Sequence, residues 1–188
     1  AQLLRHHAHQ RLLVDALSFN EEFGKFLGLR LYAYSRKSFD EPLDGIVYSV
    51  MVGMGFATLE NLLYVLKYAE IGQGLQVGIK RMFLSVPAHG SFAVVMGYFI
   101  GKAKFDTKNS FGLMLAGLLA AVFFHGTFDF FLFVNDSTVW GRRTGEGLLA
   151  GGALVSFVIS LVLSRKLIRV HQNISKEMFK DKSAGHNA

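Results

Sequence analysis

Apolar runs of membrane-spanning length follow one another along the chain. Residues 46–68, 82–100, 111–134 and 148–163 are almost free of charged side chains. Each run approaches or exceeds the roughly 20 residues with which an α-helix crosses a hydrocarbon core of about 30 Å. A globule of this length has too little interior to bury four such helices. The pattern therefore predicts an all-α fold, a polytopic transmembrane helix bundle with four spans.

A further apolar segment, residues 12–34, differs because charged side chains interrupt it. These are Asp15, Glu21, Glu22, Lys25 and Arg30. We expect an N-terminal helix that carries the Glu-Glu motif and either spans the membrane or enters it part way. Residues 1–170 then form a single membrane-embedded bundle, and residues 171–188 form a polar, frayed C-terminal tail. Since the sequence starts at Ala1 and not at a methionine, further helices upstream are left open.

Composition narrows the classes of protein further. Hydrophobic residues make up 51% of the 188 residues, charged residues make up 18%, and the mean hydropathy is +0.32. The chain is therefore too apolar to be intrinsically disordered. It has no cysteine, which excludes a disulfide scaffold, a thiolate metal site and a cysteine nucleophile.

The charge distribution favours a membrane over a nucleic acid as the partner. The formal net charge is +6, but the bases lie at the edges of the apolar runs and form no basic face. Such placement is typical of anchoring at lipid headgroups. If the first segment spans, the side that holds the C-terminus carries more Lys and Arg than the other side. We therefore expect a multi-pass plasma-membrane protein in the lipid bilayer, with a cytoplasmic C-terminus and no nucleic-acid partner.

Small residues four positions apart predict close contacts between helices. Such pairs let helix backbones approach each other in lipid. The pairs are Gly24/Gly28, Gly97/Gly101, Gly112/Ala116 and Gly147/Gly151.

Ionisable side chains within apolar segments are the candidates for function. Each costs at least about 2.5–3.5 kcal/mol at the centre of a bilayer and is a functional candidate by default. On a helix Lys25 can reach either Glu21 or Glu22, which precede it by four and three residues. A carboxylate held in this way suits a general base acting on water. A solvated helix end with an ion pair is the alternative interpretation.

Glu60 and Asn61 form a second polar group. Phe56, Glu60 and Tyr64 share one helix face, so Tyr64 can reach Glu60 with a hydrogen bond. A polar clamp between helices and a catalytic role are both open for this group.

Two histidines complete the candidates. Pro87 lacks an N–H group and frees the carbonyl near Phe83, so we expect a kink that opens space beside His89. Asp129 follows His125 by four residues and can orient its imidazole ring. Either histidine is also explained as a hydrogen-bonded core group. Because buried acids and imidazoles need partners, we expect them to face one another around a hydrated cavity.

The chain resembles PrsW, a family of intramembrane proteases that degrade anti-sigma factors, and is similar to the wider group of CAAX prenyl endopeptidases. Five motifs in order carry the resemblance, over about residues 12–165. They are Asn20-Glu-Glu-Phe-Gly-Lys25, Glu41-Pro-Leu-Asp-Gly-Ile-Val-Tyr48, Gly55-Phe-Ala-Thr-Leu-Glu-Asn-Leu-Leu-Tyr64, Pro87-Ala-His89 and His125-Gly-Thr-Phe-Asp129.

The resemblance implies an endopeptidase in which a glutamate activates water, without a cofactor. Glu21 is then the general base and Glu22 its partner. His89 positions the water, and His125, oriented by Asp129, donates to the oxyanion. Glu60 and Asn61 match the family motif without an assigned role. The implied substrate is a membrane or membrane-proximal protein segment, such as an anti-sigma factor.

Three alternatives are left open by the sequence. His89, His125, Asp129 and a glutamate together can ligate zinc, although the chain has no His-Glu-x-x-His helix. Acids and histidines in membranes also relay protons or bind ions in proteins that are not enzymes. A membrane scaffold that binds a partner without cleaving it is the third alternative.

Overall fold

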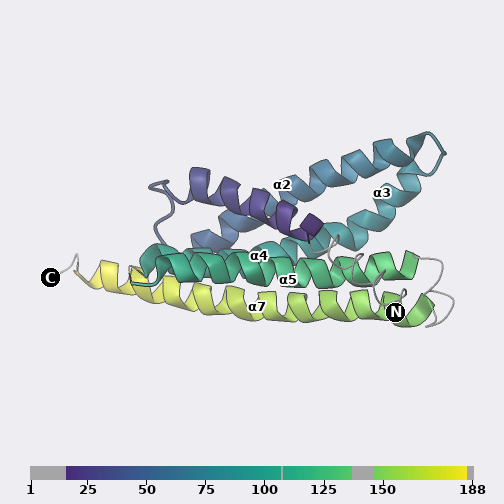
Figure 1. Cartoon of the computed structure of the whole chain (residues 1–188). Coiled ribbons are helices and arrows are strands. Elements are labelled where there is room, and N and C mark those ends of the chain that lie inside the picture. Colours follow the sequence, from purple (N-terminus) through teal and green to yellow (C-terminus); the bar gives the residue numbers. More distant parts are fainter. Residues whose placement is uncertain (1–15, 107, 137–145, 186–188) are drawn as a thin grey trace.

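The computed structural model describes residues 16–106, 108–136 and 146–185, and these residues form helices joined by short turns (Figure 1). The predicted all-α fold is confirmed. In chain order the elements are a helix over residues 16–28, its π-helical continuation η1 (Leu29–Ala33), α2 (Pro42–Ala69), α3 (Gly74–Phe83), α4 (Ser85–Phe105), α5 (Ser110–Asp136) and α7 (Glu146–Gly185).

Three segments among the described residues are long and apolar enough to cross a membrane. They are Pro42–Ala69, Gly74–Phe105 and Ser110–Leu132. They correspond to the first three predicted runs. The fourth predicted run, residues 148–163, lies in α7 and begins among residues whose side chains are not described. That span therefore stays a prediction, as does the depth to which the N-terminal helix enters the bilayer.

The helical segment Gly74–Phe105 is broken at Leu84, between α3 and α4. Pro87 is the third residue of α4 and has no N–H to donate to the carbonyl of Phe83 four residues earlier. The kink expected from the proline is confirmed. It lets α3 pack back against α2, so that the two helices form the arm on the right of Figure 1.

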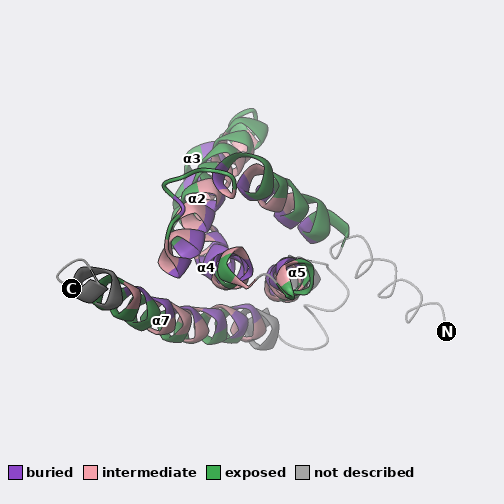
Figure 2. Cartoon of the chain, turned by 90° about the vertical axis from the view of Figure 1, so that its left-hand side faces the viewer, coloured by how far each residue is buried: buried purple, intermediate pink, exposed green. Residues whose placement is uncertain are grey.

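Helix α4 is the centre of the bundle and packs against α2, α3, α5 and α7. Residues 91–97 of α4 are all buried, so this part of the helix has no exposed face (buried residues are purple in Figure 2). Glycines on both helices let α2 and α4 approach closely. A Cβ atom added at Gly45 of α2, or at Gly97 or Gly101 of α4, would overlap backbone atoms of the other helix. The close contact predicted for the Gly97/Gly101 pair is confirmed. Among the described residues the prediction is wrong for Gly24 and Gly151, where an added Cβ would have no neighbouring atom within 4 Å.

The C-terminal end of the N-terminal helix packs against α4. Leu29 and Ala33 belong to the same buried apolar cluster as Met96 and Ile100 of α4. The hydroxyl of Tyr34 donates to the carbonyl of Ala103 at 3.1 Å. These contacts fix the helix across the bundle (purple in Figure 1) and thereby place its acidic residues.

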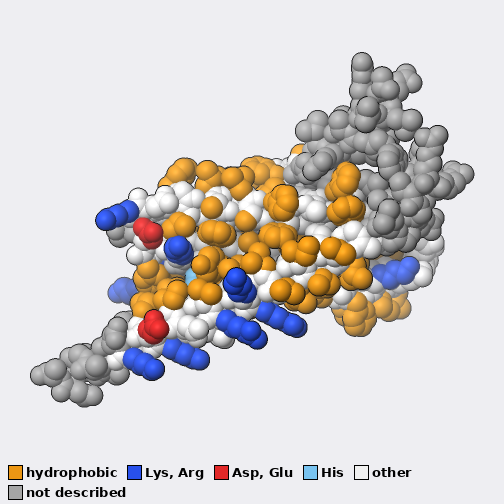
Figure 3. All heavy atoms as spheres, turned by 90° about the horizontal axis from the view of Figure 1, so that it is seen from below, with side chains coloured by type: hydrophobic (Ala, Val, Ile, Leu, Met, Phe, Trp, Pro, Cys, Tyr) orange, Lys and Arg blue, Asp and Glu red, His pale blue; other side chains and the backbone are white. Residues whose placement is uncertain are grey.

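The face of the bundle in Figure 3 carries many hydrophobic side chains, as expected for helices that face lipid. Exposed large side chains on α2 alone include Met51, Leu59, Leu63 and Leu66. Lys and Arg side chains gather along the C-terminal half of α7, where Arg165, Lys166 and Arg169 are exposed. Together with the three apolar helices this surface identifies a membrane protein.

The frayed tail expected from residue 171 is a wrong prediction, because α7 continues as a helix to Gly185. The ring of His171 stacks on Tyr98 of α4 with centroids 4.4 Å apart, and His171 and Ser175 are buried. These contacts tie the polar end of α7 to the bundle. The proposed division at residue 170 stays a prediction.

Candidate active site

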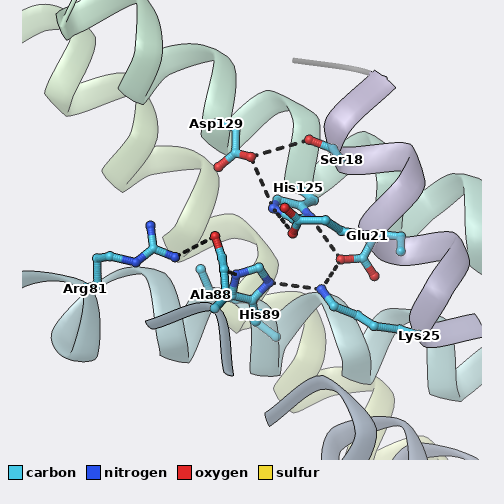
Figure 4. Close-up of polar contacts among 11 residues, drawn as sticks. Ser18, Glu21, Lys25, Arg81, Ala88, His89, His125 and Asp129 are labelled. Carbon is cyan, nitrogen blue, oxygen red and sulfur yellow. Dashed lines mark hydrogen bonds and ion pairs between the residues drawn. The ribbon is translucent and has the colours of Figure 1, made fainter. Parts of the chain in front are cut away.

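Polar side chains from five elements meet in one place inside the bundle (Figure 4). They line a cavity of about 440 Å³. The N-terminal helix supplies Glu21, α2 supplies Glu60, α3 supplies Arg81, α4 supplies His89, and α5 supplies His125 and Asp129. The prediction that the acids and the imidazoles face one another around a cavity is confirmed; their roles in a reaction stay predictions.

Glu22 lies behind this cavity and is completely buried. Its Oε1 atom lies 2.5 Å from the Nζ atom of Lys25 and 2.9 Å from the Nδ1 atom of His125. Among the described residues Lys25 forms its ion pair with Glu22, three residues away, and not with Glu21. Glu22 therefore joins the N-terminal helix to α5 through a single carboxylate oxygen.

Glu21 differs from its neighbour because its side chain keeps a quarter of its surface exposed and lines the cavity. Its Oε2 atom lies 3.7 Å from the Nε2 atom of His125 and accepts no hydrogen bond from the described residues. A carboxylate oxygen without a partner, on a side chain that lines a cavity, is suited to bind a water molecule.

His125 is held between carboxylates at both of its ring nitrogens. Its Nδ1 contacts Glu22, and its Nε2 lies 3.2 Å from the Oδ2 atom of Asp129. The contact expected from the four-residue spacing of His125 and Asp129 is confirmed, whereas the contact with Glu22 was not predicted. The ring of Phe92 stacks on the imidazole with centroids 5.3 Å apart. The ring of His125 is thus fixed in position and orientation.

His89 lies edge-on to His125, with ring centroids 4.8 Å apart. Its Nε2 atom is 2.8 Å from the Oε2 atom of Glu60, and its Nδ1 atom is 3.0 Å from the Nζ atom of Lys25. The histidine is buried, and it links the N-terminal helix to α2. His89 lies near the start of α4, and the break at Leu84 sets the direction in which α4 begins and so places His89 in the site.

Arg81 is a residue of the site that the sequence interpretation missed. Its Nη2 atom lies 2.8 Å from the Oε1 atom of Glu60, and its guanidinium lies over the ring of Tyr64 at 3.8 Å. Glu60 is therefore paired with Arg81 and His89, and the hydrogen bond from Tyr64 that its spacing allowed is not among its described contacts. The sequence contained one signal for such a residue: Glu60 lies in an apolar run, and a buried acid there needs a cationic partner.

Asn61 points away from this cluster. Its Nδ2 atom donates to the carbonyl of Gly78 in α3 at 3.4 Å, and Asn61 is not among the residues that line the cavity. This contact between α2 and α3 matches the interpretation of Asn61 as a polar clamp between helices. Its neighbour Glu60 lies in the site itself.

A metal ion has one candidate place here. Glu21, His89 and His125 each offer a ligand atom, and these atoms lie within 4.8 Å of one another. Two histidines and a glutamate are a donor set of catalytic zinc. A histidine that ligates a metal donates its other ring N–H to an acceptor. Glu22 is such an acceptor for His125, but Lys25 holds the corresponding place beside His89. The residue types fit zinc, and the hydrogen bonding around His89 does not.

Comparisons with known proteins agree on one family. The model of the PrsW family of intramembrane metalloproteases matches residues 6–164. Protease PrsW of Geobacillus kaustophilus (strain HTA426) is 42% identical over 130 residues, which cover 69% of this chain and 55% of that protein. Protease PrsW of Clostridioides difficile (strain 630) is 44% identical over 118 residues, 61% of this chain and 49% of that protein.

A third relative, protease PrsW of Bacillus subtilis (strain 168), is 39% identical over 115 residues, 61% of this chain and 50% of that protein. The chain spans about half the length of these curated relatives. No solved structure matches it. The family match covers most of the chain and includes every residue that lines the cavity. The chain belongs to the PrsW family of intramembrane proteases.

Proposed function

We propose that the chain forms the catalytic part of a membrane-embedded endopeptidase in which Glu21 is the general base for water. The observation that carries this proposal is the position of the Oε2 atom of Glu21. The side chain of Glu21 lines the cavity beside two fixed imidazoles, and its Oε2 atom, itself buried, has no hydrogen-bond partner among the described residues. The other carboxylates that line the cavity already have nitrogen partners: Glu60 contacts Arg81 and His89, and Asp129 contacts His125.

The reaction follows from these positions. Glu21 removes a proton from water, whose oxygen forms a bond to the carbonyl carbon of the substrate peptide. The C–N bond then breaks, and the proton passes from Glu21 to the amine that leaves. A positioned general base contributes about 10²–10⁴ in rate. The carboxylate of Glu22 keeps Lys25 and His125 in place and takes no proton itself.

The oxyanion of the tetrahedral intermediate needs N–H donors in the cavity. The Nε2 atom of His125 lies on the side of Glu21 and Asp129, so it can donate to the oxyanion when its hydrogen bond to Asp129 is released. Such a donor is worth about 10²–10³ in rate. Asp129 then serves to orient the ring between turnovers.

The substrate class follows from the surroundings of the cavity. The outer surface is apolar and the cavity lies among helices that are long enough to cross a membrane. We therefore propose a membrane or membrane-proximal protein segment as substrate, with an anti-sigma factor as the example that the family resemblance implies. We place the protein in the plasma membrane with its C-terminus in the cytoplasm.

The proposal is tested with the purified chain and a single-span anti-sigma factor, reconstituted together in liposomes. Products are mapped by mass spectrometry in water enriched in ¹⁸O. We expect one cleavage within or next to the span, with one solvent oxygen in the new carboxylate of the N-terminal product. Absence of cleavage by the reconstituted chain, while a full-length relative cleaves under the same conditions, contradicts the proposal for this chain.

Zinc chemistry is the second candidate, because three suitable donor atoms lie close together. Glu21, His89 and His125 would hold the ion, which would supply an activated water. Protein depleted with a tight chelator and checked for metal content decides between the two. We expect full cleavage without metal. Loss of cleavage that one equivalent of zinc restores favours the zinc mechanism.

A further inference from the structure

The two ring nitrogens of His89 have partners of opposite kinds. The Nδ1 atom lies 3.0 Å from the Nζ atom of Lys25, and the Nε2 atom lies 2.8 Å from a carboxylate oxygen of Glu60. A lysine ammonium has three N–H donors and no acceptor. It contacts a ring nitrogen at this distance by donating to it, so the Nδ1 atom of His89 carries the lone pair. The proton of the neutral ring then lies on Nε2 and is donated to Glu60.

Lys25 is itself fixed in position. Its side chain is 3% exposed and its ammonium is 2.5 Å from the Oε1 atom of Glu22. The ring of Phe56 lies on another side, with its centroid 4.6 Å from the ammonium. An ammonium with a buried carboxylate and an aromatic face around it has no freedom to leave His89.

We infer that Lys25 is a positioning residue that fixes His89 as the Nε2–H tautomer, and that His89 therefore acts as a hydrogen-bond donor in the cavity and not as a metal ligand. For catalysis this inference rests on the proposed function. The N–H of His89 holds Glu60 between turnovers and becomes available to a substrate oxygen. His89 then has no lone pair toward the cavity, which leaves Glu21 as the base.

A metal at this site would require the opposite arrangement. Ligation through the Nε2 atom of His89 needs the lone pair there and the proton on Nδ1, with an acceptor in front of it. Lys25 offers none. His125 shows the contrast within the same site, because the carboxylate of Glu22 does face its Nδ1 atom at 2.9 Å. The Nδ1 atom of His89 therefore faces a hydrogen-bond donor, whereas the Nδ1 atom of His125 faces an acceptor.

The tautomer of His89 is measured by ¹⁵N NMR on histidine-labelled full chain in detergent micelles. A His89→Gln sample assigns the signals. We expect the Nδ1 atom of His89 in the range of a bare ring nitrogen and its Nε2 atom in the range of a protonated one. Addition of zinc should leave the Nε2 signal unchanged. A bare Nε2 atom, or a zinc-dependent shift of it, overturns the inference. This measurement needs no variant of Lys25 and no activity.

Two variants of Lys25 add a matched pair. In Lys25→Met the donor is gone, and we expect the proton to redistribute between the two nitrogens of His89. In Lys25→Arg a donor-only side chain remains, and the Nε2–H tautomer should persist. Cleavage by Lys25→Met should fall in kcat by about 10²-fold with KM unchanged, and Lys25→Arg should recover part of it. Unchanged ¹⁵N signals of His89 in Lys25→Met contradict the role of Lys25. This result does not depend on whether Glu21 proves to be the general base.

Discussion

The Nδ1 atom of His125 lies 2.9 Å from the Oε1 atom of Glu22, although 103 residues separate the two along the chain. This contact gives the two adjacent glutamates different environments. Each of the two has one buried oxygen without a partner among the described residues, but the other oxygen of Glu22 holds two nitrogen donors, whereas the side chain of Glu21 lines the cavity. One acid of the pair stabilises the site, and the other is free to react.

The pair of glutamates should therefore respond differently to neutralisation. Glu22→Gln leaves the buried ammonium of Lys25 without its counter-ion, and we expect a loss of about 3–5 kcal/mol in the free energy of unfolding. Glu21→Gln removes no hydrogen bond from the described residues and should change that free energy by less than about 1 kcal/mol. Unfolding in mixed micelles measures both. Equal losses for the two variants contradict the division of labour.

Glu60 and Asn61 are neighbours in sequence, but only Glu60 lines the cavity. Glu60→Gln should lower cleavage at least about 10-fold, because Arg81 and His89 lose the charge that pairs with both. Asn61→Ala should keep the rate of cleavage and cost about 1 kcal/mol of stability, the usual contribution of one hydrogen bond. Rates and unfolding free energies of both variants are the measurement. A loss of activity in Asn61→Ala at unchanged stability gives Asn61 a catalytic role.

The close crossing of α2 and α4 depends on Gly45. An added methyl group would overlap the backbone of Gly101, so we expect Gly45→Ala to cost about 1–3 kcal/mol. Gly55 lies in the same helix with open space around it, and Gly55→Ala should stabilise by about 0.5–1 kcal/mol. Opposite shifts in thermal unfolding are the expected result. Two shifts of the same sign would show that α2 and α4 do not approach as closely as described.

His171 predicts how stability depends on pH at the polar end of α7. Burial, aided by the nearby charge of Lys102, lowers the pKa of His171 from its ordinary value of 6.5 to about 4, against a hydrogen bond to the carbonyl of Pro42. The unfolded chain thus binds a proton at a higher pH than the folded chain does. The stability contributed by the neutral ring is complete above pH 6.5 and is lost as the pH falls toward 4, by up to about 3 kcal/mol.

The matched variant for this pH dependence is His171→Phe, which keeps an aromatic ring to stack on Tyr98 and cannot titrate. Unfolding free energies of both proteins between pH 7 and pH 4 are compared. The slope in this window should be smaller in the variant. Parallel curves would show that His171 does not contribute to the pH dependence.

Much of the fold could be predicted because lipid imposes simple constraints on a sequence. Length and hydropathy identify α2, α4 and α5, and Pro87 places the break before α4. The end of α7 could not be predicted in this way. Its polar residues after 170 suggest fraying, whereas the structure continues the helix and packs it on the bundle through contacts such as the stacking of His171 on Tyr98.

The membership of the site could be predicted because ionisable groups in apolar helices need partners. The pairings within one helix could be predicted from spacing, as for His125 with Asp129 and for Lys25 with one of the two glutamates, but the pairings between helices could not. The contacts of Glu22 with His125 and of Lys25 with His89 join residues distant in sequence. The role of Arg81 could not be predicted either, because nothing in the sequence shows that α3 folds back beside Glu60.

Cleavage by Glu21→Gln tests the central claim most directly. The variant is compared with Glu70→Gln, which neutralises an exposed acid at the end of α2. Both are assayed with the co-reconstituted anti-sigma factor under single-turnover conditions, after each is shown to unfold like the unmodified chain. We predict that Glu21→Gln cleaves at least about 10²-fold more slowly and that Glu70→Gln cleaves at the normal rate. A normal rate in folded Glu21→Gln would contradict the account.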